Sequence, residues 1–357
     1  MRVDATDGNP ECPIMGVKSK RSTIVDVAKL AGVSTKTVSR VLNREPHVTT
    51  EVRERVDHAA RQLNYQPNVL AQGLVRRRSF LIGLVYENPS PSYVVELQMG
   101  ALDRLKDERY SLIVVPVRSV RENAGNIVGL LRAAALDGVI LAPPASDHPD
   151  VLASLDAAGI SFARIAPTRM LDQGPSVVLD DVAAARAVAE HVLSFGHRRI
   201  GIIKGDPTHP SSEARLIGYT QALAASGVEL RLDWIEHGLY TFESGFRAAQ
   251  RLLGGTGSAR PTAILVQNDE MAVGTLMAAR ELGIPVPEAL SIVGFDDSEI
   301  SRVAWPRLTT VRQPVFDMAR TAAGMLLETL EGGEPSVLES HDFELLIRDS
   351  VAVAPVD

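Results

Sequence analysis

Lys36 and Arg40 lie four residues apart in the stretch STIVDVAKLAGVSTKTVSRVLN, residues 22–43. On a helix that spacing places both cations on one face, with Thr35 beside them at the start. Lysine and arginine can donate hydrogen bonds to guanine O6 and N7, and a threonine methyl can contact thymine. These residue types at this spacing are therefore suited to reading base edges in DNA. A solvated surface of a small helical bundle would also explain them, and the spacing alone leaves both interpretations open.

The surrounding residues predict three short helices. Thr23 can cap a first helix, and Gly32 follows where a chain leaves a helix through the left-handed conformation. Ser34 can cap a second helix over 35–42, and a third begins near Thr49. Three helices with a glycine in the first turn make a helix-turn-helix unit, whose second helix lies in the major groove of DNA. The expected core positions are Ile24, Val27, Ala28, Ala31, Val38, Leu42, Val52, Val56, Ala59 and Leu63.

Charge is divided unevenly along the 357-residue chain, whose formal net charge is −7. Between Lys18 and Arg78 there are 13 Lys/Arg and 5 Asp/Glu, a balance of +8, so the remainder carries −15. A basic segment on an acidic body indicates a polyanion-binding head. The length exceeds one typical domain, and the hydrophobic fraction of 45% is typical of a globular protein.

Residues 22–79 resemble the DNA-binding head and hinge of the LacI/GalR family of bacterial transcriptional regulators. The matching segments are TIVDVAKLAGVSTKTVSRVLN, VTTEVRERVDHAARQLNYQPN and LAQGL. The resemblance implies that Leu74 is the hinge leucine that wedges into the minor groove and bends the duplex. It implies that three arginines, 76–78, lie along phosphates. The DNA-binding positions that it implies are Thr23, Ser34, Thr35, Lys36, Thr37, Ser39, Arg40, Asn43, His47, Tyr65, Asn68, Ala71 and Leu74.

From Phe80 onward short apolar runs alternate with amphipathic helical segments, which favours parallel sheets with helices on both faces. Strands are expected over 80–86, 111–117, 137–144, 161–167, 199–205, 262–269 and 290–297. Helices are expected, among others, over 91–108, 181–195, 213–226, 243–253 and 269–282. So many strands exceed one compact sheet, and two lobes are expected. The family resemblance extends over this part and implies a two-lobed fold similar to periplasmic sugar-binding proteins, with crossovers near residues 181, 312 and 341.

The expected fold class is therefore α/β. It has an N-terminal three-helix helix-turn-helix head plus hinge helix, then a two-lobed periplasmic-binding-protein-like domain of doubly wound parallel sheets. The expected divisions are a flexible tail over 1–21, the helix-turn-helix domain over 22–66, the hinge helix and linker over 67–79, and the effector-binding and dimerisation domain over 80–357. Within the last, lobe 1 is expected at about 80–180 and 313–340, and lobe 2 at about 181–312 and 341–357.

Ligands of doubly wound sheets bind beyond the carboxyl ends of the strands. Polar residues are expected there at Asn88 with Ser92 and Tyr93, at Arg164, at Asn268 with Asp269, and at Asp296 with Asp297. Asp269 and Asp297 are better explained as helix caps than as ligand contacts.

The resemblance adds further positions in this body. The motif SSEARLIGY, residues 211–219, matches the family's pocket motif and places Arg215 in the cleft. Tyr240 would be the aromatic ring that packs on the effector, although it could instead pack between the lobes. A carboxylate, an amide and an arginine converging on an aromatic face suit a sugar. The candidate effector-binding residues are Asn88, Tyr93, Arg164, Arg215, Tyr240, Asn268, Asp296 and Gln313.

Arg164 departs from the family pattern, because lactose-repressor-like members can carry an aspartate at this position. Arginine reverses the charge and offers five donors and no acceptor. Two roles are open. Arg164 either donates to oxygens of a ligand, such as an oligosaccharide or a sugar acid, or bridges the lobes by pairing with a carboxylate such as Asp296.

An enzymatic role is not expected. The sequence contains no H-E-x-x-H, G-x-S-x-G or G-x-x-x-x-G-K-[ST], and the eight histidines have no metal-ligand spacing. Asp296 and Asp297 are adjacent at a strand end and point to opposite faces, so they do not form an acid/base pair. No catalytic residue, metal or cofactor is therefore expected. A periplasmic sugar-binding protein is an alternative, which the head and the polar first twenty residues disfavour.

The sequence predicts a cytoplasmic transcriptional regulator, with repression favoured, that binds a palindromic operator as a homodimer. Its single cysteine, Cys12, fits a reducing compartment, and no apolar run is long enough to cross a membrane. The absence of a leucine heptad repeat after residue 340 favours a dimer over a tetramer. The expected effector is a sugar or sugar derivative, with a non-sugar corepressor such as a nucleobase as the alternative.

Overall fold

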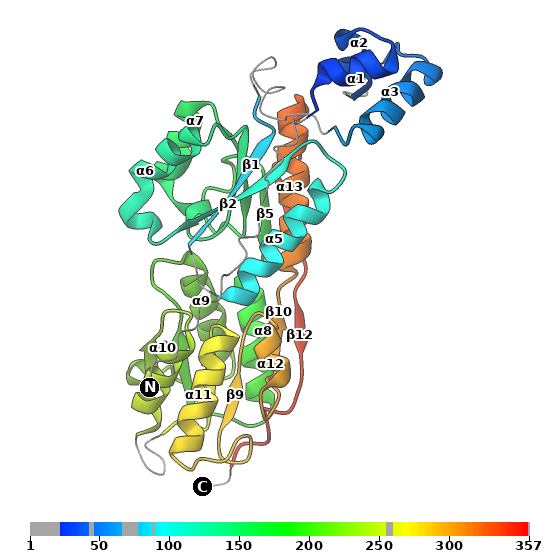
Figure 1. Ribbon diagram of the computed structural model, residues 1–357. Helices are drawn as coiled ribbons and strands as arrows, with labels where there is room; N and C mark the ends of the chain where they lie inside the picture. The colour runs from blue at the N-terminus through cyan, green and yellow to red at the C-terminus, as the bar shows by residue number, and fades with distance from the viewer. Residues whose placement is uncertain (1–21, 43–45, 66–77, 88–89, 255–259, 356–357) are drawn as a thin grey trace, which may run out of the picture. The chain divides into compact units, whose positions relative to one another are not determined.

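The computed structural model describes residues 22–42, 46–65, 78–87, 90–254 and 260–355. The chain divides into two compact units, Met1–Arg77 and Arg78–Asp357 (Figure 1). Most of the predicted hinge segment lies outside the described residues. So do five predicted contact residues, namely Asn43, Asn68, Ala71, Leu74 and Asn88. The domain boundaries given above stay predictions.

The first unit contains the three predicted helices, which are α1 (Ile24–Ala31), α2 (Thr35–Leu42) and α3 (Thr50–Gln62). Their core consists of Val27, Ala28, Ala31, Val38, Val41, Val56, Ala59 and Ala60. Four expected core positions, Ile24, Leu42, Val52 and Leu63, are only partly buried and pack against this cluster, and Val41 rather than Leu42 is buried beside Val38. Residues three apart share a helix face, and here that face includes Val41. Leu42 packs against the edge of the cluster.

The helix ends of this unit follow the predicted signals. Thr23 and Asp26 form a capping box at the start of α1, and Gly32 ends that helix at φ 65°. Ser34 Oγ accepts a hydrogen bond from the Thr37 amide at 3.1 Å at the start of α2. The guanidinium of Arg55 on α3 donates to the Ala31 carbonyl at 2.6 Å, which satisfies an acceptor at the end of α1. The turn before α2 is therefore fixed from both sides.

The second unit begins with a six-stranded parallel sheet in the order β11-β5-β4-β3-β1-β2. Its strands are β1 (Leu81–Glu87), β2 (Ser111–Val117), β3 (Gly138–Leu141), β4 (Ser161–Ile165), β5 (Ser176–Leu179) and β11 (Leu338–His341). The helices α5 (Pro91–Leu105) and α13 (Val315–Glu331) pack on one face. On the other face lie the helices α6 (Val120–Ala133) and α7 (Pro149–Ala158). The short η1 (Ala145–Asp147) lies between β3 and α7. These elements form the first lobe.

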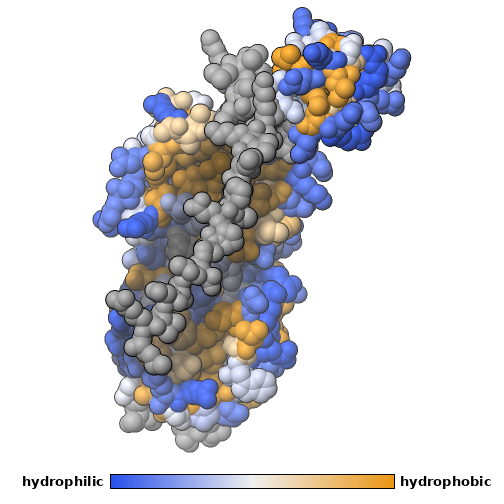
Figure 2. Space-filling model, viewed as in Figure 1, coloured by the Kyte–Doolittle hydropathy of each residue, from blue (hydrophilic) through white to orange (hydrophobic). Residues whose placement is uncertain are grey.

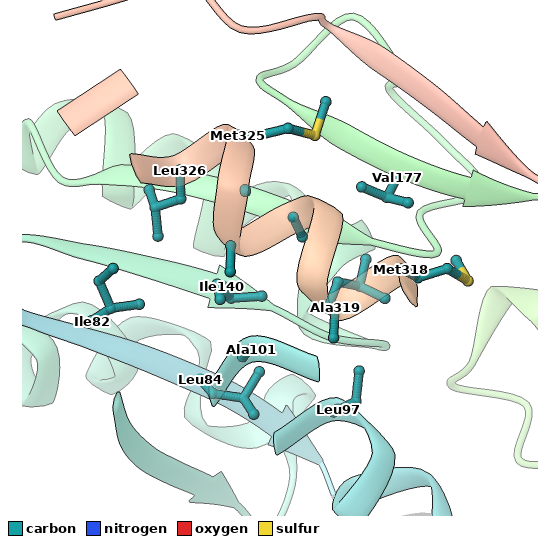
Figure 3. Close-up of a cluster of buried hydrophobic side chains, with 14 of the residues drawn as sticks. Ile82, Leu84, Leu97, Ala101, Ile140, Val177, Met318, Ala319, Met325 and Leu326 are labelled. Atoms are coloured by element: carbon teal, nitrogen blue, oxygen red, sulfur yellow. The ribbon is translucent and has the colours of Figure 1, made fainter. Parts of the chain in front are cut away.

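Close packing of α5 and α13 builds the larger face of this lobe. In Figure 3, Leu97 and Ala101 of α5 and Ala319 of α13 lie against Leu84 and other strand side chains. A glycine permits the close approach, because a Cβ on Gly100 would lie 2.0 Å from the Phe316 carbonyl oxygen. The two helices are thus fixed as one layer above the sheet.

The second lobe contains a four-stranded parallel sheet in the order β7-β6-β8-β9. Its strands are β6 (Ile200–Lys204), β7 (Ile235–His237), β8 (Ala263–Val266) and β9 (Ser291–Val293). One core cluster includes α8 (Asp181–Ser194) and α9 (Pro210–Ala225), and another includes α10 (Phe242–Leu253) and α11 (Asp269–Glu281). The remaining elements are η2 (Leu232–Trp234), α12 (Glu299–Val303) and the antiparallel pair β10 (Thr310–Arg312) and β12 (Glu344–Leu346).

Three connections join the lobes within this unit. They run from β5 into α8, from β10 into α13, and from β11 into β12 (Figure 1). The carboxyl ends of β1, β6, β8 and β9 lead into segments that supply polar side chains to one region. Parallel strands in both lobes therefore position the candidate ligand site.

Candidate functional site

The first unit presents a polar face at the start of α2. Val38 and Val41 are buried, whereas Thr35, Lys36 and Arg40 are exposed on the same helix. Other predicted DNA-contact residues divide by exposure. The exposed ones are Thr23, Ser34 and His47, and the half-buried ones are Thr37, Ser39 and Tyr65. The cations and hydroxyls predicted to contact DNA thus lie at the accessible surface of a fixed helix.

The second unit contains a cavity between its two lobes. Its free volume is about 40 Å³, which is room for roughly three water molecules. The residues that line it are Ser90, Tyr93, Pro143, Ala166, Asp181, His209, Ser211, Arg215, Tyr240, Asn268, Asp296 and Gln313. The first lobe contributes the uncharged Ser90, Tyr93, Pro143 and Ala166, whereas every charged lining residue belongs to segment 181–296. The polar recognition chemistry is therefore concentrated in the second lobe.

Arg215 is the central cation of this cavity. Its Nε donates to Asp181 Oδ1 at 2.7 Å, and its Nη1 donates to the Gln267 carbonyl at 2.6 Å. Asp296 Oδ1 lies 3.9 Å from Nη1, and the guanidinium stacks 3.7 Å above the Phe295 ring. Burial opposes the charge, but Asp181 and the neighbouring acidic groups outweigh it, so the pKa of Arg215 is raised. Arg215 is thus a fixed donor whose charge Asp181 already balances.

An aromatic wall stands beside Arg215. The Tyr240 ring contacts the His209 ring edge-on, with centroids 5.3 Å apart. Gly205 leaves room for Tyr240, because a Cβ there would lie 2.0 Å from Tyr240 Cζ. Burial raises the pKa of Tyr240 and lowers the pKa of His209 to about 4. Both rings are therefore uncharged at neutral pH.

Asn268 lines the cavity and also begins α11. Its Oδ1 accepts from the Met271 amide at 3.0 Å, and its Nδ2 donates to the Tyr240 carbonyl at 3.0 Å. The helix cap predicted at Asp269 is therefore corrected to Asn268. Asp269 instead accepts from the Ser298 amide at 2.8 Å, and burial raises its pKa to about 7.

A hydrogen bond joins the lobes beside this cavity. Ser90 Oγ, at the start of α5, donates to Glu270 Oε1 on α11 at 2.5 Å. Asn268 Nδ2 donates to the other oxygen, Glu270 Oε2, at 2.9 Å. Burial raises the pKa of Glu270. Both hydrogen bonds are donated to its carboxylate and therefore favour the charged form. Asn268, which lines the cavity, is thereby coupled through Glu270 to a contact between the lobes.

The position of Arg164 contradicts both roles expected for it. Arg164 is fully buried and is not among the described residues that line the cavity. Its guanidinium donates to four backbone carbonyls of the first lobe, at 2.6–3.2 Å, those of Ser146, Arg169, Met170 and Gln173. Its nearby carboxylate is Asp147, at 3.5 Å, rather than Asp296. Arg164 therefore holds the loop after β4 in place, and the argument for a sugar acid loses its support.

Six of the eight predicted effector-binding residues line the cavity, and they are Tyr93, Arg215, Tyr240, Asn268, Asp296 and Gln313. Six further lining residues were not predicted, and they are Ser90, Pro143, Ala166, Asp181, His209 and Ser211. Two of these carried a signal in the sequence. Asp181 stands at the predicted crossover, and Ser211 opens the motif that contains Arg215.

His209 should make stability depend on pH. Its folded pKa of about 4 lies below the ordinary 6.5, so its contribution is complete above pH 6.5 and is lost as the pH falls towards 4. Relative to His209→Phe, which cannot titrate, the wild type should lose up to about 3 kcal/mol of unfolding free energy over that range. Urea denaturation at several pH values measures this difference. Parallel pH profiles for the two proteins would contradict a buried neutral histidine.

Two other kinds of site are absent from the described part of the chain. Its helices include none with the length and apolar character needed to span a bilayer. Within the same residues, no group of three or more His, Cys, Asp or Glu side chains is arranged to hold a metal ion.

Known protein families match both parts of the chain. The family described as "Bacterial regulatory proteins, lacI family" matches residues 23–68, and "Periplasmic binding protein-like domain" matches residues 189–351. The chain is 32% identical to the HTH-type transcriptional repressor PurR of Haemophilus influenzae over 341 residues, covering 92% of this chain and 98% of that protein.

Two solved structures are similar over most of the chain. One is the lac repressor dimer bound to operator and the anti-inducer ONPF, with a TM-score of 0.80 and 29% identity. It aligns over 93% of this chain and 100% of the other. The second is the complex of the transcriptional regulator CelR with cellobiose, with a TM-score of 0.70 and 29% identity, over 92% of this chain and 100% of that chain.

Proposed function

Because the chain belongs to the LacI family of bacterial regulatory proteins, we propose that it is a cytoplasmic transcriptional repressor that binds a palindromic operator as a homodimer. The observation that carries this proposal is the helix-turn-helix unit, which fixes α2 with Thr35, Lys36 and Arg40 exposed. A second helix of such a unit reads base edges in the major groove. The remaining predicted DNA-binding residues stay part of the proposal.

The cavity of the second unit is proposed to bind the effector, a neutral sugar or sugar derivative. Arg215 and Asp296 offer hydrogen-bonding groups, and Tyr240 offers a ring, as a hydroxylated ligand with an apolar face requires. The CelR structure contains cellobiose, which supports the carbohydrate class. A nucleobase would use the same aromatic wall and is the second ligand to test.

Effector and operator are linked through the lobes. An effector that prefers one arrangement of the lobes changes operator affinity by its differential affinity for the two arrangements, and the operator changes effector affinity by the same factor. The sign of that change depends on which arrangement DNA prefers. No chemical step is required of the protein, in agreement with relatives that are DNA-binding regulators.

One experiment tests both halves of the proposal. Rounds of selection from random duplex DNA should yield a palindromic site whose affinity falls steeply with salt. The full-length protein should then be screened against monosaccharides, cellobiose and purine bases by thermal shift, and each hit added to the operator complex. Enrichment of no sequence would contradict the DNA-binding half. Hits that leave operator affinity unchanged would contradict effector control.

Arg40→Ala should weaken binding to the selected site by about 1–3 kcal/mol and relax specificity at one base pair. The reason is that arginine on α2 can pair with guanine in the groove. Arg61→Ala on α3 is the matched control, since that exposed residue lies in the last turn of α3 rather than on α2. Affinities for cognate and scrambled DNA, measured by fluorescence anisotropy, separate the cases. An equal loss of Arg40→Ala on both sequences would mean that Arg40 contacts only phosphate.

Met99→Glu should convert the proposed dimer to monomers. Apolar side chains are exposed on α5 at Val95 and Met99 and on β2, the edge strand of its sheet, at Ile113 and Val114. Apolar residues also reach the surface in separate patches on the face shown in Figure 2. A charge within a buried interface costs several kcal/mol, so sedimentation should show dissociation. Leu232→Glu, at an exposed residue of η2, should remain dimeric. An unchanged dimer in Met99→Glu would place the interface elsewhere.

A further inference from the structure

The cavity is lined by backbone in an unusual conformation. Nine non-glycine residues of the described chain have positive φ, and three of them line the cavity. These three are Ala166 at 47°, Tyr240 at 58° and Asp296 at 114°. The first two lie near the left-handed helical region, whereas 114° is beyond it and is suited to glycine. Such strain persists only where surrounding contacts hold it, and it gathers at ligand sites.

Asp297, the residue after Asp296, pairs with several arginines. Its carboxylate is almost completely buried, and three arginines from separate segments pair with it. Arg302 Nη2 of α12 and Arg312 Nε of β10 each donate at 2.9 Å, and Arg348 of the C-terminal segment donates as well. One carboxylate thus anchors three pieces of chain around the residue next to Asp296.

The other side of the same turn is held independently. The Asp296 amide donates to the Val311 carbonyl at 2.8 Å. The Ser298 amide donates to the buried Asp269 carboxylate at 2.8 Å, and Thr310 Oγ1 donates to that carboxylate at 2.7 Å. Residues 296–298 are therefore held on two flanks, and loss of the Asp297 ion pairs would leave Asp296 anchored on one flank only.

The held conformation determines where the Asp296 carboxylate lies. It lines the cavity, accepts from Gln313 Nε2 at 2.5 Å, and is 3.9 Å from Arg215. Adjacent side chains Asp296 and Asp297 therefore do different work, one facing the cavity and the other facing three arginines.

We propose that Asp297 is a positioning residue, whose ion pairs with Arg302, Arg312 and Arg348 hold Asp296 in a strained backbone conformation that directs its carboxylate into the cavity. The use of that carboxylate for effector recognition rests on the proposed function. The strain and its cause do not, and both can be measured without DNA or effector.

If the backbone at Asp296 is strained, the glycine variant should be more stable than the alanine variant, which reverses the usual order. Asp296→Gly and Asp296→Ala remove the same carboxylate, so the difference between them reports the backbone. Glycine normally destabilises relative to alanine, but at φ 114° it should unfold at a higher temperature, by about 2 °C or more. Asp103 on α5 is the matched control, since there alanine should be the more stable. Alanine more stable than glycine at both positions would overturn the proposal.

The role of Asp297 is tested by the crystal structure of Asp297→Asn. The φ of Asp296 should become negative, and the hydrogen bond that Gln313 donates to Asp296 should be lost. A residue that merely anchors the C-terminal segment would lower the melting temperature but leave that φ and that bond unchanged, which would refute the positioning role. If Asp297→Asn does not fold, the double variant Arg302→Ala/Arg312→Ala decides by the same two readouts, because both arginines are half-exposed. Failure of the DNA selection would leave these results untouched.

Discussion

Arg164→Met should lower the free energy of unfolding by about 5 kcal/mol, among the largest effects of any single change in this protein. The substitution removes the buried donor of four backbone carbonyls, those of Ser146 in η1 and of Arg169, Met170 and Gln173 in the loop after β4. Each unsatisfied buried acceptor costs about 1–3 kcal/mol. The neighbouring Asp147 carboxylate would lose a cation 3.5 Å away. Urea denaturation followed by circular dichroism measures the loss.

The control for this change is Arg121→Met, at an exposed position of α6, which should alter stability by less than about 0.5 kcal/mol. If Arg164→Met folds at low temperature, compounds found by thermal shift with the wild type should still bind it, because Arg164 is not a cavity residue. A small loss of stability combined with a loss of ligand binding would restore the ligand-contact role that the structure contradicts.

Arg215→Met is the second change with a large expected effect. It removes the cation from a buried pair and leaves Asp181 without its partner at 2.7 Å. Breaking such a pair from one side costs about 3–5 kcal/mol, mainly because a buried charge is left uncompensated. The cation also leaves the Phe295 ring and the Gln267 carbonyl. Unfolding free energies from urea denaturation should show this loss.

A second substitution separates the loss of the Arg215 contacts from the cost of leaving the Asp181 charge unpaired. In Arg215→Met/Asp181→Asn both charges are absent, so the double variant should be more stable than Arg215→Met. Effector binding should be lost in both, because the central donor of the cavity is gone. A double variant less stable than Arg215→Met would mean that Asp181 is held by contacts other than Arg215.

The head was predictable because its signals are local. Thr23, Gly32 and Ser34 mark the helix ends, and the structure confirms α1, α2 and the start of α3 within one residue. The seven predicted strands are also present, because continuous apolar runs are typical of buried parallel strands. Five strands, β5, β7, β10, β11 and β12, were not predicted; two of them, β11 and β12, have the sequences LESH and ELL, which are too short and too polar to stand out. These two form because the lobe crossovers bring them beside β5 and β10.

The candidate site was only partly predictable, for a related reason. Residues at strand ends or within a family motif, such as Tyr240 and Asp296, could be named from the sequence. Ser90 and His209 reach the cavity only because distant segments meet there. Arg164 was misjudged because its partners are backbone carbonyls, whose positions no residue type reveals. Which groups a buried charged residue contacts is determined by the tertiary fold.

The hydrogen bond from Ser90 to Glu270 has a kinetic consequence. It joins the lobes beside a cavity whose free volume of about 40 Å³ is far smaller than a sugar, so we expect a sugar to enter only after the bond breaks and the lobes separate. Capture from this state is then gated, with opening before binding. The observed rate of uptake should level off at high effector concentration, at a ceiling that Ser90→Ala raises. The speed of the regulatory response would be a property of the protein's own opening, independent of how much effector the cell supplies.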